Sequence, residues 1–238
     1  MSYINNGGNI LWLNDSTFIE GGLPNIEKVL DYYGVKIGTG VVLEENTSNM
    51  LNQSPYLILP EISNHKVTED FYTNNNIVFA QATKIETKND DELYNSNITI
   101  NKILSSTGTS AYFNDVTNIN SFESGPFILG LESIKQIDEN KSSKLIIYSD
   151  NFFITDSSIT IGSNKYALVN LYNNLDLVLN SVAYLTNRED AIVIRKDTGN
   201  ITIIPTKQQD LVVKTIIFVI PILIILFGII VWQIRKRK

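Results

Sequence analysis

The feature that most constrains this chain is an unbroken apolar run near its C-terminus, residues 216–232. With its flanks, the run has about the ~20 residues that an α-helix needs to cross a lipid bilayer. It starts at Ile216 and contains Pro221 and Gly228, which membrane helices tolerate. It ends at Trp232, a residue type typical of the membrane interface. The run therefore predicts a transmembrane helix.

Four consecutive basic residues close the sequence, namely Arg235, Lys236, Arg237 and Lys238. Basic residues beside a membrane helix indicate the cytoplasmic side. We therefore predict a single-pass cell-membrane protein whose body lies outside the cytoplasm. Its predicted parts are an extracytoplasmic domain (1–205), a juxtamembrane linker (206–212), a transmembrane helix (213–233) and a basic cytoplasmic tail (234–238). The alternative is a tail-anchored protein whose body stays in the cytoplasm.

The N-terminal residues lack the apolar stretch of a signal peptide. Residues 2–6 instead resemble the end of a helix that stops at Gly7 or Gly8. We expect from these two observations that the sequence is the C-terminal part of a longer protein, with an export signal upstream.

Charge and cysteine content exclude several classes of function. The net charge is −6 although the last four residues are all basic, so the body is clearly acidic. An acidic body lacks the positive surface that binds nucleic acid phosphates. The absence of cysteine excludes disulfides, thiolate metal sites and cysteine nucleophiles.

Apolar runs of strand length alternate with helical patterns along the body. The principal predicted strands are 9–13, 56–59 and 144–148, and the predicted helices are 24–33 and 170–185. Such alternation favours an α/β fold with a mainly parallel sheet flanked by helices, of the amidotransferase-like or flavodoxin-like type. Shorter strands are predicted at 35–37, 41–43, 77–82, 98–104, 127–131, 191–195 and 201–204, and residues 89–97 are predicted to form a polar loop.

Polar residues follow several of the predicted strands. In α/β sheets, ligands bind beyond the carboxyl ends of the strands. The candidate crevice residues are Asp15, Glu61, His65, Ser149 and Asp150. Asp and Asn at strand ends more commonly cap the next helix or turn, and we favour this structural interpretation.

Motifs for catalysis and cofactor binding are absent from the sequence. His65 is the only histidine, and there is no Gly-x-Ser-x-Gly motif or histidine pair for zinc. The glycines at 38 and 40 lack the third glycine of a dinucleotide fingerprint. We therefore predict a non-enzyme without cofactor, while a carboxylate-only Mg²⁺ or Ca²⁺ site stays open. The competing hypothesis is an amidotransferase-like hydrolase that uses Asp15, His65 and Asp150.

Five segments together resemble the Gld family of auxiliary ABC-transport proteins. They are YINNGGNILWLND, PNIEKVLDYYGVKIGTGVVLEE, YLILPEISNHKVTED, KLIIYSDNFFITD and NLYNNLDLVLNSVAYLTNREDAIVIRKDTG. The resemblance implies an extracytoplasmic α/β domain, distantly similar to glutamine-amidotransferase-like folds, beside an ABC-2-type permease and its ATPase. The amidotransferase nucleophile is missing because the chain has no cysteine.

The positions that match the family pattern are Gly7, Gly8, Asp15, Pro24, Gly34, His65, Asp150, Asn174, Asp176 and Asn180. We expect the glycine pair to give a tight entry into a strand and Gly34 to end a helix. Asn180 is expected to hydrogen-bond from its helix to a neighbouring loop. The function that follows is a non-catalytic accessory subunit of an ABC transporter, with the permease, the ATPase and the lipid bilayer as partners. The alternative is a membrane-tethered receptor or carbohydrate-binding surface protein.

Overall fold

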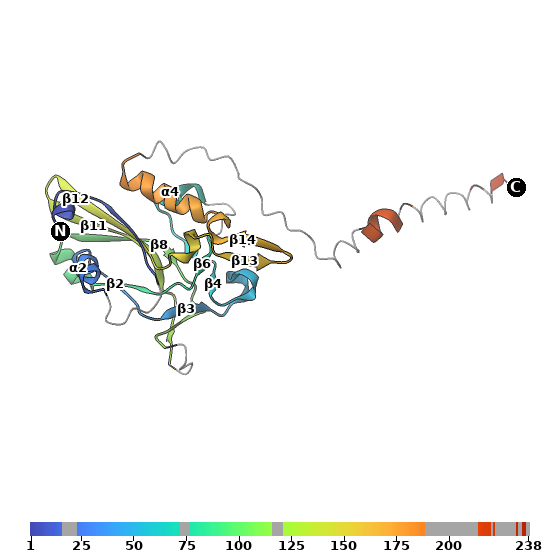
Figure 1. Cartoon of the computed structure of the whole chain (residues 1–238), viewed down its shortest axis with the longest axis horizontal. Helices are drawn as coiled ribbons and strands as arrows, with labels where there is room; N and C mark the ends of the chain where they lie inside the picture. Colours follow the sequence, from blue (N-terminus) through green and yellow to red (C-terminus); the bar gives the residue numbers. More distant parts are fainter. Residues whose placement is uncertain are drawn as a thin grey trace. The chain divides into compact units, whose positions relative to one another are not determined.

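The computed structural model describes residues 1–15, 23–71, 77–115 and 121–188, and near the C-terminus 214–219, 221, 232, 235 and 236. The chain divides into two compact units, which are described separately. One comprises residues 1–161 and 165–196, and the other comprises 162–164 and 197–238. The sheets that carry the core lie in the first unit (Figure 1).

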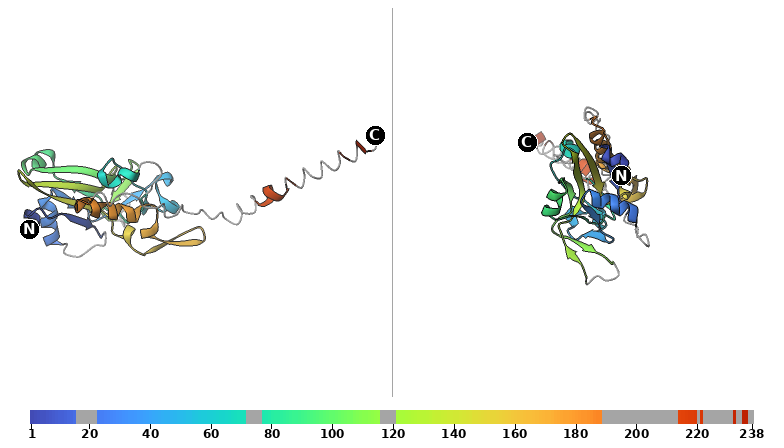
Figure 2. Two further views of the ribbon diagram at one scale, coloured as in Figure 1. Left: turned by 90° about the horizontal axis from the view of Figure 1, so that it is seen from above. Right: turned by 90° about the vertical axis from the view of Figure 1, so that its left-hand side faces the viewer.

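The main sheet is mixed and has seven strands, which twist along their length (Figure 2). Its strands are β1 (Ile10–Leu13), β2 (Val35–Ile37), β5 (Glu61–Ile62), β7 (Ile85–Thr87), β8 (Ile98–Ser105), β11 (Ile128–Asp138) and β12 (Lys141–Tyr148). Among the described strands of this sheet, only the β1–β12 pair is parallel. β11 pairs antiparallel with β12, β8 and β7, while β2 pairs with β7 and β5 with β8, again antiparallel.

Three small sheets accompany the main one. They comprise β3 (Val41–Glu44) with β9 (Ser110–Phe113) and β10 (Glu123–Ser124), β4 (Leu57–Ile58) with β6 (Phe79–Ala80), and β13 (Ser158–Ile161) with β14 (Asn164–Ala167).

The helices are short. In the described part of the first unit, the α-helices are α1 (Ser2–Asn5), α2 (Pro24–Tyr32), α3 (Asp90–Asn95) and α4 (Asn174–Leu185), and the 3₁₀ turns are η1 (Thr47–Asn49), η2 (Leu51–Gln53), η3 (Lys66–Phe71), η4 (Phe152–Ile154) and η5 (Leu168–Asn170).

Local sequence signals explain where α2 begins and where α1 and α2 end. Pro24 occupies the first turn of α2, where its missing N–H costs no hydrogen bond. Gly34 follows the helix with φ of +71°, a left-handed conformation that glycine adopts without strain. Gly7 has φ of +84° just after α1. The predicted helix ends at Gly7 and Gly34 are therefore confirmed.

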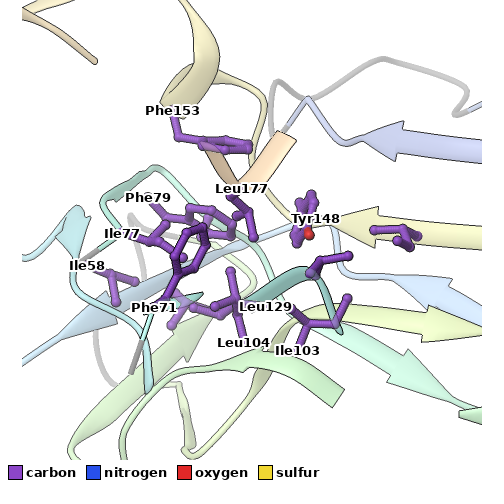
Figure 3. Close-up of a cluster of buried hydrophobic side chains, with 14 of the residues drawn as sticks. Ile58, Phe71, Ile77, Phe79, Ile103, Leu104, Leu129, Tyr148, Phe153 and Leu177 are labelled. Carbon is purple, nitrogen blue, oxygen red and sulfur yellow. The ribbon is translucent and has the colours of Figure 1, made fainter. Parts of the chain in front are cut away.

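Apolar side chains cover both faces of the main sheet. Alternate residues of β12 point to opposite faces, so Ile146 and Tyr148 join one core cluster while Leu145 and Ile147 join another. The first cluster includes residues of α4, and Figure 3 shows its central side chains. The second includes residues of α2. The sheet is thus packed between α4 and α2 (Figure 1).

The predicted fold class is wrong. The sequence predicts a mainly parallel sheet, whereas the observed sheet is curled, mixed and predominantly antiparallel, and strands outweigh helices. Residues 56–59, a predicted central strand, contribute only β4 to a separate two-stranded sheet. Continuous apolar runs are typical of strands that are buried on both faces, as in a parallel sheet. Here helices on both faces bury an antiparallel pair, β11–β12, so its strands carry similar apolar runs.

The predictions of a transmembrane helix and of single-pass membrane localisation are also contradicted. Among the described residues, no helix combines the length and the apolar character needed to cross a membrane. Residues 214–219 are helical and exposed. Most of the predicted span, together with Gly228, Arg237 and Lys238, lies outside the described residues. The expected extracytoplasmic body depended on that helix and is withdrawn with it.

Candidate functional site

The only histidine lies in a buried polar network between the main sheet and α4. His65 Nε2 is 3.1 Å from Glu132 Oε2, and both side chains are almost fully buried. The backbone N–H of Val67 donates to His65 Nδ1 over 3.2 Å. In the neutral ring the proton must therefore be on Nε2, which donates it to Glu132. Both ring nitrogens of His65 are engaged within the protein.

Glu132 is the charged centre of this network. It lies on β11 opposite Asn101 of β8, whose Nδ2 donates to Glu132 Oε2 over 2.8 Å. Burial alone would raise the pKa of Glu132. Hydrogen bonds from His65, Asn101 and Tyr184 more than offset this effect and hold the pKa below its ordinary value. Glu132 is therefore an ionised carboxylate at neutral pH.

Helix α4 contacts the same network. The ring of Tyr184 meets that of His65 edge-on, with the centroids 5.6 Å apart. On β12, Lys144 Nζ lies 3.9 Å from the centroid of the Tyr184 ring, a cation–π distance. Asn180 Nδ2 donates to the carbonyl of Val67 over 3.1 Å, which confirms the predicted contact from this helix to a neighbouring loop.

Ser149 and Asp150 lie elsewhere, at the end of β12, and both are fully buried. Asp150 Oδ2 accepts from the Ala80 N–H at 2.5 Å, and Oδ1 accepts from the Phe152 N–H at 2.7 Å. Burial raises the pKa of Asp150 to about 7 even though these amides favour the charged form. Its contacts are those of a carboxylate that organises turns.

The remaining predicted crevice residues lie on the surface. Asp15 follows β1 and is exposed, and Glu61 is exposed at the start of β5, where it pairs with Ser105. In the part of the chain that the structure describes, the hydrogen bonds of His65 lead to Glu132 and to the backbone around Val67. Asp15 and Asp150 each lie two positions beyond the Leu13–Tyr148 pair of the parallel β1–β12 ladder, so the register places them at the same end of the sheet, whereas His65 is bonded to Glu132.

The hydrolase alternative requires His65 within about 3.2 Å of both an Asp carboxylate and a Ser hydroxyl. The carboxylate at His65 belongs to Glu132 instead. A general base also needs a free ring nitrogen to take a proton from a nucleophile, and neither nitrogen of His65 is free. No group of three or more histidine and acidic residues in metal-binding geometry occurs among the described residues.

Sequence reasoning missed Glu132. Its position inside the run FILGLESI was the available signal, because a carboxylate between apolar strand residues is buried only when it is paired. The sequence could not show that its partner was His65, 67 positions away.

Asn174, one of the family-pattern positions, has a structural role. Its side chain accepts from the Val78 N–H and donates toward the carbonyls of Val78, Phe153 and Leu168. These bonds tie the start of α4 to three separate segments. The side chain is fully buried, so its polar atoms need these partners.

The outward face of α4 carries an apolar row. Leu175, Leu179 and Val182 are 42%, 39% and 43% exposed, respectively. Their i, i+4, i+7 spacing aligns them along one side of the helix. The inward side carries Leu177, Ser181 and Tyr184, which are buried.

Comparison with known proteins gives little further guidance. No protein-family model and no curated protein matches the chain. One matching solved structure is described as the mmIFT52 N-terminal domain, with 12% sequence identity, a TM-score of 0.49, and coverage of 83% of this chain and 70% of that chain. A likeness at this level carries no argument about function.

Proposed function

We propose that this chain is a non-catalytic protein-binding module, an accessory subunit that contacts its partner through the outward face of α4. The apolar row of Leu175, Leu179 and Val182 is the observation that carries this proposal. Three aligned apolar side chains on one helix face form a surface that a partner can cover. Covering a large aliphatic side chain contributes up to roughly 1.5–3 kcal/mol.

The polar chemistry near α4 supports a binding role over a catalytic one. The ring nitrogens of His65 are both used in internal hydrogen bonds. Asp150 holds the backbone amides of Ala80 and Phe152. The polar atoms of His65 and Asp150 therefore maintain the fold around α4. Recognition of a partner through an apolar surface does not need these polar atoms.

The resemblance to Gld-type auxiliary proteins gives the expected partners of such an accessory subunit, which are the permease and ATPase of an ABC transport system. This assignment is tested by affinity purification of the tagged chain from a detergent extract of its native cells. Recovery of an ABC ATPase and a multi-span permease in fixed proportion supports it. A chain that is recovered alone contradicts the accessory role.

A matched pair of variants tests the surface itself. Leu175→Asp places a charge in the apolar row, near the N-terminus of α4, where an acidic residue suits the helix dipole. Leu23→Asp is the control, because Leu23 is also 42% exposed and precedes a helix, α2. We expect Leu175→Asp to reduce the recovered partner by about tenfold or more, equivalent to ~1.4 kcal/mol or more of binding energy.

The control is expected to retain the wild-type yield of partner. Thermal unfolding of both variants should stay close to that of the wild type, since both sites are on the surface. Equal recovery of partner by Leu175→Asp and Leu23→Asp would exclude the outward face of α4 as the contact surface.

A further inference from the structure

We propose that His65 is a pH-sensitive latch that holds η3 against α4, and that its protonation loosens this packing. The link from the latch to partner binding rests on the proposed function of the α4 surface. The latch itself rests only on the contacts around His65, Val67 and Asn180.

Val67 is held from two sides by different elements. Its N–H donates to His65 Nδ1, and its carbonyl accepts from Asn180 Nδ2 of α4. The residue is completely buried, so water cannot replace either bond without local opening. The ring of His65 thus fixes the start of η3, and through Val67 it fixes the contact of η3 with α4.

The hydrogen-bond pattern is compatible only with a neutral ring. Protonation would place a second N–H on Nδ1, directed at the N–H of Val67. Two donors cannot share a hydrogen bond, so the ring and the first turn of η3 must separate. The Nε2–H bond to Glu132 survives, and the buried carboxylate stabilises the positive ring.

The charged and titratable groups around His65 come from each element packed on it. β11 contributes Glu132, α4 contributes Tyr184, and β12 contributes Lys144, which lies against the Tyr184 ring. Within η3, Lys66 and Glu69 are exposed and pair with each other at 3.3 Å. The carboxylate of Glu132 is the charged group in direct contact with the imidazole. Imidazole is the side chain that ordinarily changes charge between about pH 5 and 8.

Hydrogen exchange of backbone amides tests the latch directly. We expect the protection of the Val67 amide, corrected for intrinsic rates, to fall about tenfold or more between about pH 7.5 and about pH 5.5. The Tyr33 amide, which bonds to Leu30 at the end of α2, serves as an internal reference and should change little. Equal changes at Val67 and Tyr33, or none, would overturn the latch.

The variant His65→Gln separates titration from structure. Glutamine offers a carbonyl to the Val67 N–H and an amide donor to Glu132, but it does not titrate. Protection of Val67 in this variant should be independent of pH; a fall equal to that of the wild type would refute the latch. If the variant does not fold, the ¹⁵N chemical shifts of the His65 ring in the wild type show which ring nitrogen carries a proton at each pH, and so test the latch. A proton already on Nδ1 at about pH 7.5 overturns the proposal.

These measurements need no partner, so they test the latch even if the proposed function is wrong. The comparison of partner recovery by wild type and Leu175→Asp at neutral pH tests the proposed function even if the latch is wrong.

Discussion

Replacement of Phe79 by alanine is expected to lower the free energy of unfolding by about 3–5 kcal/mol, the range for loss of a buried aromatic ring. Phe79 is fully buried in the core between the main sheet and α4 (Figure 3). Its ring centroid is 4.8 Å from that of Phe153 and 6.2 Å from that of Tyr148. The variant loses these contacts and leaves a cavity that the surrounding side chains fill only in part. Urea-induced unfolding measures the change.

Phe122→Ala is the matched control. Phe122 is 53% exposed, and it also contacts another aromatic ring, that of Phe113 at 5.7 Å. The same chemical change should therefore cost less than about 1 kcal/mol there. Similar losses in the two variants would show that Phe79 is not part of a tightly packed core.

Asp150 is expected to make the protein less stable as pH rises from about 4 to about 7. Its pKa in the folded protein is about 7, raised by burial from an ordinary value of 3.8. In this window the folded state holds a proton that the unfolded state has lost. The contribution of Asp150 is therefore fully present below the unfolded pKa and is lost as pH passes the folded pKa. A shift of about three units corresponds to roughly 4 kcal/mol.

The difference in unfolding free energy between wild type and Asp150→Asn isolates this effect, because it cancels the other titrating groups. Asparagine does not titrate, and its amide group must face a backbone N–H, of Ala80 or of Phe152. At about pH 4 the variant should be less stable than wild type by about 1–3 kcal/mol, since one buried donor is left unpaired. The difference should shrink and then change sign as pH approaches 7, because the loss of roughly 4 kcal/mol by the wild type exceeds it. Parallel pH profiles of the two proteins would contradict the assignment.

The opposite sign applies to Glu132, whose pKa is lowered in the folded protein. Its contribution to stability is present above the unfolded pKa of a glutamate and is lost as pH falls through the folded pKa. The two carboxylates therefore act in opposite directions as pH changes. Both carboxylates are buried, so burial alone does not determine whether the pKa is raised or lowered.

Helix positions were predictable because their signals are local. Pro24 and Gly34 enclose α2, and the spacing of apolar residues identified α4, although it begins at Asn174 rather than at residue 170. The exception is α3, which falls in a predicted polar loop. Its signal is a capping box between Asn89 and Glu92, which stabilises a helix with a single buried side chain.

Strand pairing was not predictable in the same way, because the partners are far apart in sequence. The sequence predicts a strand at 127–131, whereas β11 continues to Asp138. The second half of β11 is polar and partly exposed, so it lacks the apolar run that identified its first half. β11 then returns as β12 through a short connection, which makes this central pair antiparallel. A parallel sheet could not accommodate that hairpin.

The candidate site was predictable only in part, and for the same reason. His65 was identified because it is the only histidine, but Glu132, Asn101 and Tyr184 come from three other elements. The predicted strands at 191–195 and 201–204 lie outside the described residues.

The parallel pairing of β1 with β12 has a consequence for synthesis of the chain. Ile10 is aligned with Leu145, so the strand ILWL leaves the ribosome about 135 residues before the segment with which it pairs. At ~5–20 residues per second, this delay is on the order of ten seconds. During that time four apolar residues with unpaired backbone groups are exposed to other nascent chains. The order of translation therefore leaves the first strand of this sheet unpaired until its partner strand has been synthesised.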